Sequence, residues 1–429
     1  MATPVAPAAP PSQEALLGLF PPGTALDRDG TLMIGGCRAT ELADRFGTPA
    51  LLVDEAALRA RARRYADGLA ARWPASRVAF ASKAFPCTAV YRLLAEEGLS
   101  IDVAGGGELT LALAGGVDPA SLVVHGNAKT EAELRLAVEA GAGLVVVDSF
   151  DDIDRLERIV PAGAEQAVLV RVTPGIRPDT HAAVATGQEG SKFGLGLSQA
   201  RQAIARLRAS STLRLDGVHV HIGSQILDTE PFARAVEAVA ALGAFAVYDL
   251  GGGLGARYTY QDRPPSIEEY LDTLVTAARR VLPAEAEIII EPGRSMVAET
   301  GVSLYRATTV KHGGPTFVAV DGGMGDNLEV ALYGQRFEAA VATRVGGGDP
   351  CQLVGRHCES GDTLSAGVPL RDPRPGDLIA VPATGAYCYS LSNNYNGALR
   401  PPVVFCRDGE ARAVVRRETY ADLLRRDLP

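Results

Sequence analysis

Eight short apolar runs divide the chain between Arg77 and Glu291, and stretches with helical spacing lie between them. The runs are apolar throughout, without the alternation of a half-exposed strand, as expected for strands buried on both faces. Strands that alternate with helices in this way predict an α/β fold, a (β/α)8 barrel of the TIM type. The runs are Arg77–Ala81, Leu99–Ala104, Ser121–Gly126, Gly143–Asp148, Ala167–Val172, Gly217–Ile222, Phe245–Leu250 and Glu287–Glu291.

A barrel of this kind places its chemistry just beyond the C-terminal ends of its strands. We therefore expect the functional site among the polar and glycine residues that follow the eight runs. These residues are Lys83, Gly105–Glu108, His125, His221, Ser224, Gly251–Gly253, Glu291 and Arg294.

Beyond about residue 299 the pattern changes to short strands separated by turn residues, and Asp408-Gly409 predicts a hairpin between two of them. The stretch ALDRDGTLMIGG, which begins at Ala25, has the same character. We therefore expect a flexible leader over residues 1–25, a β-rich domain from residues 26–48 and 299–429, and the barrel over residues 49–298.

The composition restricts the partners and the compartment. Of the 429 residues, 47% are hydrophobic and 22% are charged, with a net charge of −9, which argues against nucleic acid or an anionic membrane as a partner. No apolar run is long enough to cross a bilayer.

The six cysteines lie far apart without a Cys-x-x-Cys pair, which argues against a zinc or thioredoxin-like site. Because no signal-peptide pattern is present, we expect reduced thiols and a cytoplasmic location.

Lysine is rare in this chain, which contains only Lys83, Lys129, Lys192 and Lys311. Lys83 follows the first barrel run, where two interpretations are open: a surface lysine whose stem covers apolar groups, and a reactive amine. An amine can lose its proton and a guanidinium cannot, so the persistence of a lysine here favours a Schiff-base role.

Two segments at strand ends, DLGGGLG and EPGR, suggest anion binding. The glycines Gly251–Gly253 could bring bare backbone N–H groups against a phosphate, or could form no more than a tight turn. Glu291 could face a pyridine nitrogen and raise its pKa, and Arg294 could hold a phosphate or carboxylate. A salt-bridged barrel rim is the alternative for both charged residues.

The segment HVHIGSQ carries His219 and His221 on one predicted strand, so we expect them on opposite faces, one in the core and one at the barrel mouth. A metal site is disfavoured because no carboxylate or cysteine follows nearby. A lysine for an aldehyde, glycines and Ser224 for a phosphate, a glutamate for a ring nitrogen and a histidine for a ring face together indicate pyridoxal 5′-phosphate.

With these segments the chain resembles the barrel-type (fold type III) pyridoxal-phosphate-dependent decarboxylases, and most closely diaminopimelate decarboxylase. The resemblance runs from about residue 26 to the C-terminus. It implies a barrel and a β-rich domain arranged as in alanine racemase, and conversion of meso-2,6-diaminopimelate to L-lysine and CO2. The segment from Ala185 to Gly194 is similar to the mobile active-site loop of this family. The matching motifs are FASKAF, HVHIGSQI, DLGGGLG, EPGRSMV, VDGGMGDN, HCESGD and GAYCYSLSNNYN.

The resemblance implies a role for each matching residue. Lys83 would hold the cofactor as a Schiff base, His221 would stack on its ring, and Glu291 would pair with the ring nitrogen. The residues around the phosphate or the substrate would be Ser224, Gly252, Gly253, Gly293 and Arg294, and Tyr387 would contact both cofactor and substrate. The far end of the substrate would be contacted by Glu329, Tyr333 and Glu359.

Cys358 on its own admits five roles: redox thiol, metal ligand, nucleophile, proton donor or buried apolar side chain. The cysteine spacing argues against a metal, the expected compartment against redox chemistry, and the covalent role of Lys83 against a second nucleophile. A proton donor and a buried apolar side chain remain, and the resemblance implies the proton donor. Family members are homodimers that combine the barrel of one subunit with the β domain of the other, which implies that Cys358 and Glu359 arrive from the partner chain.

Glu329 stands where the family usually has an arginine that binds the distal carboxylate of diaminopimelate. Two interpretations are open. Glu329 could turn outward, with Arg294 or Arg336 compensating for the missing arginine. Alternatively the substrate has changed, to D-lysine or D-ornithine with a distal amine, or to an amino acid tethered to a carrier protein, as in specialised metabolism.

Two other classes of protein with this barrel remain as alternatives. Some relatives are catalytically inactive regulators that lack the lysine or the cysteine, whereas this chain keeps Lys83, Glu291 and Cys358. Amino-acid racemases use a similar barrel, but their β-domain motifs differ from HCESGD.

Overall fold

The structure is a computed structural model that describes residues 12–176, 187–188 and 190–428. The chain forms two compact units, which we describe separately. Unit 1 comprises residues 1–58, 256–262 and 297–429, and unit 2 comprises residues 59–255 and 263–296. Among the described residues, no helix combines the length and the apolar character needed to cross a membrane.

Unit 2 is a closed barrel of eight parallel strands, and all eight predicted runs form its strands. Closure occurs where β8 pairs with β9 and β13 pairs with β5. The strands are β5 (Ser76–Ala81), β6 (Ser100–Val103), β7 (Leu122–Val124), β8 (Leu144–Val147), β9 (Gln166–Thr173), β11 (Leu213–Val220), β12 (Val247–Asp249) and β13 (Glu287–Ile290), and the two-residue β10 (Leu195–Gly196) extends β9. Side chains from different strands fill the interior, as in other barrels of this kind.

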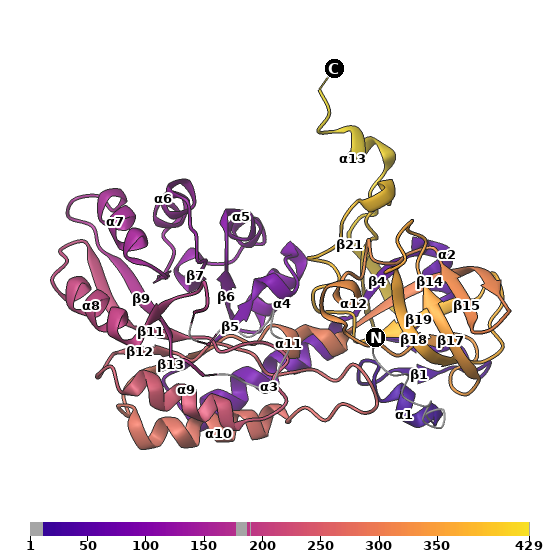
Figure 1. The fold of residues 1–429 in the computed structure, drawn as a ribbon, viewed down its shortest axis with the longest axis horizontal. Helices are drawn as coiled ribbons and strands as arrows, with labels where there is room; N and C mark the ends of the chain where they lie inside the picture. The colour runs from indigo at the N-terminus through magenta and orange to yellow at the C-terminus, as the bar shows by residue number, and fades with distance from the viewer. Residues whose placement is uncertain (1–11, 177–186, 189, 429) are drawn as a thin grey trace. The chain divides into compact units, whose positions relative to one another are not determined.

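Helices cover the outside of these strands (Figure 1). They are α3 (Glu55–Arg72), α4 (Thr88–Glu96), α5 (Gly106–Ala114), α6 (Glu131–Ala140), α7 (Phe150–Ile159), α8 (Leu197–Arg208), α9 (Glu230–Ala240) and α10 (Ile267–Val281), followed by the short α11 (Arg294–Val297). Local sequence sets several helix ends. In α6 the Thr130 side chain and Glu133 form a capping box, and Gly141 ends the helix with φ 78°. Ser266 and Glu269 cap α10 in the same way.

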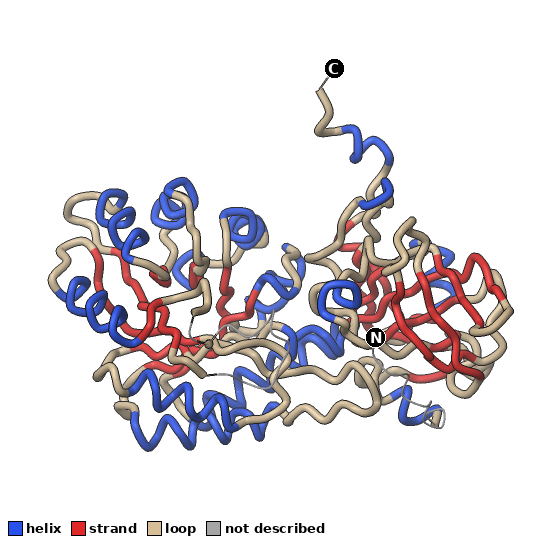
Figure 2. The backbone as a smooth tube through the Cα atoms, in the orientation of Figure 1, coloured by secondary structure: helices blue, strands red, loops and turns tan. Residues whose placement is uncertain are grey.

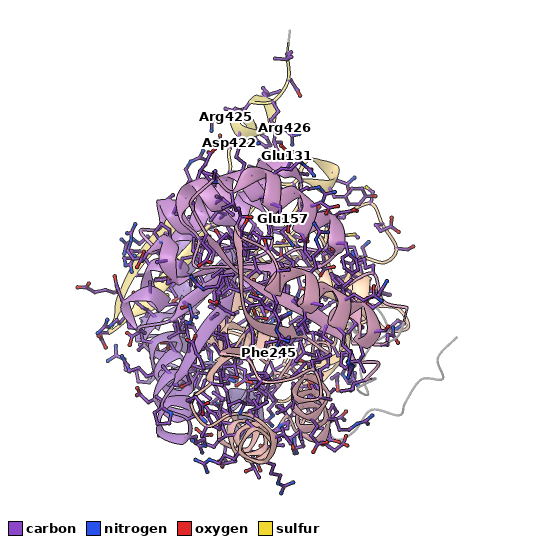
Figure 3. The ribbon with its side chains drawn as sticks, turned by 90° about the vertical axis from the view of Figure 1, so that its left-hand side faces the viewer. Glu131, Glu157, Phe245, Asp422, Arg425 and Arg426 are labelled. Carbon is purple, nitrogen blue, oxygen red and sulfur yellow. The ribbon has the colours of Figure 1, made fainter. Side chains whose placement is uncertain are left out.

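The outer helix faces carry charged side chains. Glu157 of α7, labelled in Figure 3, lies 2.6 Å from the guanidinium of Arg206 on α8. Exposed pairs of this kind contribute about 0–1 kcal/mol each, so the barrel depends mainly on the packing of its apolar interior.

Unit 1 contains a large sheet in the order β18-β17-β15-β14-β4-β20-β21, in which β14 also pairs with β19 and β19 pairs with β16. Figure 2 draws strands red. Its strands are β4 (Ala50–Asp54), β14 (Gly301–Lys311), β15 (Thr316–Val320), β16 (Ala340–Val341), β17 (Asp349–Val354), β18 (Thr363–Leu370), β19 (Leu378–Pro382), β20 (Val403–Arg407) and β21 (Glu410–Val415). A second sheet joins β1 (Ala25–Leu26), β2 (Leu32–Ile34) and β3 (Cys37–Arg38), and the helices are α1 (Gln13–Leu17), α2 (Ala39–Phe46), α12 (Glu329–Tyr333) and α13 (Tyr420–Leu424). The predicted hairpin is present, with φ 53° at Asp408 and 82° at Gly409.

Two boundaries differ from the predicted ones. The leader expected up to residue 25 includes a helix, α1, and Leu16, Leu19 and Phe20 are buried in the core of unit 1. Residues 1–11 lie outside the described part of the chain. The segment Ala50–Asp54, expected in the barrel, forms β4 in the large sheet of unit 1, because its backbone pairs with β14 and β20.

Candidate active site

Lys83 lies in a one-turn 3-10 helix (Ser82–Ala84) directly after β5, between two buried neighbours, and is itself exposed. Its positive charge acts on the buried groups Asp102 and His221, so the amine stands over the C-terminal end of the barrel. Lys129, by contrast, is buried and ion-paired with Asp152 at 2.8 Å. This geometry leaves Lys83 available for covalent chemistry and commits Lys129 to the protein interior.

Three loops at strand ends meet in a glycine-rich cradle. Glycine is required here, because a Cβ on Gly252 would lie 2.0 Å from the carbonyl oxygen of Glu291, and one on Gly253 would lie 2.5 Å from that of Gly223. Gly253 also has φ 119°, which side chains rarely adopt. The loops after β11, β12 and β13 are therefore packed backbone against backbone.

Polar side chains border this cradle. The Nε–H of Arg294, which is buried, donates to the Ser224 hydroxyl at 3.1 Å. The backbone N–H of Gly252 donates to Nδ1 of His221 at 3.2 Å. Burial, with the positive charges of Lys83 and Arg171, holds the pKa of His221 well below its ordinary value, so the ring is neutral at pH 7. Gly293 packs with its Cα against Ala81, which brings the EPGR turn close to the end of β5.

The two histidines of HVHIGSQ do not diverge to opposite sides as predicted. A period of two places residues i and i+2 on the same face of a strand, so the expectation of opposite faces for His219 and His221 was wrong. His219 is 1% exposed and its ring lies edge-on to that of His125, with 4.7 Å between the centroids. Both histidines therefore face the same end of the barrel.

Glu291, at the end of β13, is 5% exposed and lies between two imidazoles. Its Oε1 is 2.6 Å from Nε2 of His125, and its Oε2 is 3.2 Å from Nε2 of His219. Burial alone would raise the pKa of this carboxyl, but the two histidines outweigh burial and hold the pKa well below its usual range. Glu291 is therefore a buried carboxylate that remains ionised.

Each of the four groups His125, His219, Asp249 and Glu291 could also offer a ligand to a metal ion, since their ligand atoms all lie within 4.8 Å of one another. The 2.6 Å separation between Glu291 and His125 is a hydrogen-bonding distance. Metal–ligand bonds of about 2.0–2.1 Å in tetrahedral geometry would separate those atoms by more than 3 Å. The cluster thus has the spacing of ion pairs and hydrogen bonds rather than that of metal ligands.

In unit 1 the HCESGD motif forms a turn built on Asp362. One oxygen of this carboxylate accepts the backbone N–H of Met324 at 2.7 Å, and the other accepts the backbone N–H of His357 at 2.8 Å. The backbone N–H of Cys358 donates to Oδ1 of Asn396 at 2.8 Å. The motifs DGGMGDN, HCESGD and NNYN therefore converge, and they present Cys358 as an exposed thiol.

The remaining predicted site residues also belong to unit 1. Tyr387 has φ 64°, a strained conformation for a tyrosine, and Glu359 is exposed beside Cys358. Tyr333 is partly buried at the end of α12. Glu329, on the same helix, is 0% exposed, so the interpretation in which it turns outward to solvent is wrong.

Comparisons with known proteins agree with this geometry. The model of the pyridoxal-dependent decarboxylases, pyridoxal binding domain, matches residues 55–298. A diaminopimelate decarboxylase of Actinosynnema pretiosum subsp. auranticum is 47% identical over 425 residues, which cover 96% of this chain and 95% of that protein. One from Bacillus subtilis is 43% identical and covers 94% and 96%, respectively. The crystal structure of diaminopimelate decarboxylase from M. jannaschii in complex with L-lysine has a TM-score of 0.89 at 30% identity, covering 95% of this chain and 98% of that one.

The chain belongs to the pyridoxal-dependent decarboxylases. It is therefore a carboxy-lyase that uses pyridoxal 5′-phosphate and acts on a small amino acid. The residues of unit 2 fit this cofactor. The crowded glycines leave backbone N–H groups free of Cβ atoms, a buried guanidinium borders them, and Glu291 offers a buried negative charge for a ring nitrogen.

Sequence reasoning missed three charged residues of the site, Asp102, Arg171 and Asp249, which lie on β6, β9 and β12. All three are buried. The sequence signal for each was a single charged residue inside an otherwise apolar run. Burying such a charge costs free energy unless the barrel interior provides a partner. Part of the predicted mobile loop, Ala185, Thr186 and Glu189, lies outside the described residues.

Proposed function

We propose that the protein decarboxylates meso-2,6-diaminopimelate to L-lysine and CO2. The observation that carries the proposal is the buried, ionised Glu291 beside the glycine cradle and the exposed Lys83, all at the C-terminal end of one barrel. The relatives that share 40–47% of their residues with this chain are diaminopimelate decarboxylases, which supports this substrate.

Each residue of unit 2 has a role in this proposal. Lys83 would supply the amine that binds the cofactor's aldehyde. The neutral imidazole of His221 would stack on one face of the cofactor ring. Glu291 keeps a proton on the ring nitrogen. When bound, pyridoxal phosphate withdraws the electron pair left on the α-carbon as CO2 departs. The phosphate would be held by Ser224, Gly252, Gly253, Gly293 and Arg294.

Unit 1 supplies the remaining roles. Cys358 donates a proton to the α-carbon after CO2 leaves, and Glu359, Tyr333 and Tyr387 contact the substrate. We propose that the enzyme is a homodimer in which Cys358 and Glu359 serve the barrel of the partner. Mixing Lys83→Ala with Cys358→Ala protein should then restore about a quarter of wild-type activity, since half of randomly formed dimers are mixed and each has one intact site. No recovery after subunit exchange would exclude shared sites.

A second candidate function is decarboxylation of a different substrate, and the burial of Glu329 supports this candidate. A buried carboxylate near the distal end of the substrate would repel a carboxylate and attract an amine, as in D-lysine or D-ornithine. An amino acid tethered to a carrier protein belongs to the same candidate. We further propose that the enzyme works in the cytoplasm, a compartment consistent with its six free cysteines.

A CO2-release assay tests these proposals on four substrates: meso-diaminopimelate, D-lysine, D-ornithine and a carrier-protein thioester of an amino acid. The first proposal expects kcat/KM on diaminopimelate to exceed the others by several orders of magnitude. Turnover of a distal-amine substrate or of the thioester, without turnover of diaminopimelate, would replace it by the second candidate. The variant Glu329→Gln keeps the shape of the side chain and removes its charge. It should alter the preference among the four substrates only if Glu329 contacts the distal group of the substrate.

A further inference from the structure

Each of the two carboxylate oxygens of Glu291 lies beside a different imidazole, one as an ion pair and one as a hydrogen bond. Oε1 lies 2.6 Å from His125, which follows β7, and Oε2 lies 3.2 Å from His219, in β11. Two partners on separate oxygens fix the rotation of the carboxylate plane as well as its position. Because the cofactor ring must meet this carboxylate at one defined angle, this fixation bears directly on catalysis.

A buried carboxylate does not remain ionised without support. Removing a single carboxylate from water is so costly that the group normally binds a proton instead. A protonated Glu291 could not keep the ring nitrogen protonated, because it would carry no negative charge. The groups around Glu291 therefore decide whether it can act.

A second carboxylate, Asp102, approaches the same nitrogen of His125 that faces Glu291, with its Oδ1 3.8 Å from Nε2. Burial alone would lower the pKa of His125, but Asp102 and Glu291 outweigh burial and raise it. Burial, opposed by His125, raises the pKa of Asp102 to about 7. His125 thus carries a positive charge, and its Nε2 faces both carboxylates.

The other neighbours have different charge states. Burial lowers the pKa of His219 to about 3, so this ring is neutral and donates through Nε2–H. Burial and the charge of Glu291 hold the pKa of Asp249 well above its ordinary value, so Asp249 is a neutral acid. Arg171 and Lys83 add positive charge nearby. Glu291 is the member of this cluster that the surrounding groups keep negative.

We propose that Asp102, His125 and His219 are positioning residues that keep Glu291 ionised and aimed at the cofactor's ring nitrogen. The proposal rests on the proposed role of Glu291. His125, whose positive charge Asp102 supports, supplies the countercharge, and His219 in β11 supplies a hydrogen bond from a neutral ring. None of the three needs to touch the substrate.

The experiment uses pyridoxal phosphate labelled with 15N in the ring and bound to the full-length enzyme. The ring-nitrogen NMR shift reports whether that nitrogen carries a proton. The variant His125→Phe keeps the aromatic packing and removes both nitrogens, whereas His125→Gln places an amide N–H where Nε2 was. We expect the signal to move toward the unprotonated position in His125→Phe and Asp102→Asn, and to stay near the wild-type position in His125→Gln.

Kinetics and cofactor affinity provide the second readout. His125→Phe should lower kcat by about 10²-fold, the effect of misplacing a reacting group by about 1 Å, with a much smaller change in KM. His125→Gln should recover most of that loss, and the exposed His312→Gln is the matched control. His219→Phe is a second test, but it alters a core strand, so the His125 and Asp102 variants decide the outcome.

A ring nitrogen that stays protonated in both His125→Phe and Asp102→Asn would overturn the proposal, as would equal activity of the Phe and Gln variants. These results are distinguishable from failure of the proposed function. A wild-type enzyme that shows a protonated ring nitrogen but no CO2 release from diaminopimelate would exclude the substrate and leave the positioning network in place. A wild-type ring nitrogen without a proton would exclude the role of Glu291 itself.

Discussion

The carboxylate of Asp362 holds His357 twice: one oxygen accepts both its backbone N–H and its Nδ1–H, each at 2.8 Å. The imidazole is buried and stacks on Tyr395, with 5.8 Å between the ring centroids. Cys358 is the next residue along the chain. The turn that presents the proposed proton donor is therefore fixed by a residue four positions away.

Asp362→Ala should therefore lower kcat by about 10²-fold and leave cofactor binding intact. The variant removes the acceptor of three hydrogen bonds, two from His357 and one from Met324, so the Cys358 turn loses its fixed geometry. Lys83, Glu291 and the glycine cradle, which would hold the cofactor, lie on unit 2 and should be unaffected. Stopped-flow kinetics with a spectroscopic titration of the cofactor checks this, with the exposed Asp44→Asn of unit 1 as control. Parallel losses of kcat and cofactor affinity would contradict it.

Cys358 should be the first thiol to react with iodoacetamide in the native enzyme, with loss of activity and retention of cofactor. It is the one exposed cysteine, and the other five are buried. Burial also raises the pKa of Cys37, Cys87, Cys351 and Cys406 above the ordinary thiol value, so these form thiolate less readily.

Peptide mass spectrometry at one equivalent of reagent, beside the residual activity, measures this selectivity. Cys358→Ala should show the same loss of turnover and no inactivation by the reagent. Alkylation of Cys358 without loss of activity would exclude it as the proton donor.

The barrel was predictable from the sequence because all eight of its strands are apolar runs separated by helical spacing. The sheet to which Ala50–Asp54 belongs could not be predicted, because a fully buried strand has the same sequence pattern in either sheet. Its pairing with β14 also spans some 250 residues of sequence. The helix α1 was missed for a different reason. Its few apolar residues lie next to an Ala/Pro-rich stretch, and their burial depends on the tertiary core.

The site could be predicted in part. Lys83, His221 and Glu291 follow apolar runs, so the barrel rule places them together. The network around Glu291 could not be predicted, because Asp102 and Asp249 lie within strands and their neighbours depend on strand order and register. His219 and His221 were assigned to opposite faces, although residues two apart on a strand share a face.

Lys129→Ala should destabilise unit 2 by about 3–5 kcal/mol, the usual effect of removing one partner of a buried ion pair. The ammonium of Lys129 donates to two backbone carbonyls, of Gly126 at 2.6 Å and Val146 at 2.8 Å, besides pairing with Asp152. Without it, the buried Asp152 keeps only the partly exposed guanidinium of Arg155, 3.4 Å away, as a countercharge.

Urea unfolding monitored by Trp73 fluorescence measures this loss. Trp73 is the single tryptophan of the chain and is buried in unit 2, where its indole N–H donates to the carbonyl of Ala286 at 2.8 Å. Lys311→Ala, on the exposed end of β14, is the matched control and should change the unfolding free energy by less than about 0.5 kcal/mol. Equal midpoints for both variants would show that the buried pair contributes nothing.

Asp326 should make unit 1 less stable as the pH rises from about 4 to 7. Burial raises its pKa from 3.8 to about 7, although the Tyr305 hydroxyl and the Gly323 N–H both donate to it. The folded state therefore binds a proton that the unfolded state has already released in this range, so the unfolding free energy falls with increasing pH, by on the order of 4 kcal/mol. Asp326→Asn keeps an acceptor for Tyr305 and cannot ionise. In differential scanning calorimetry its Tm relative to wild type should rise between pH 4.5 and 7.5, and a difference that stays constant or falls would contradict the raised pKa.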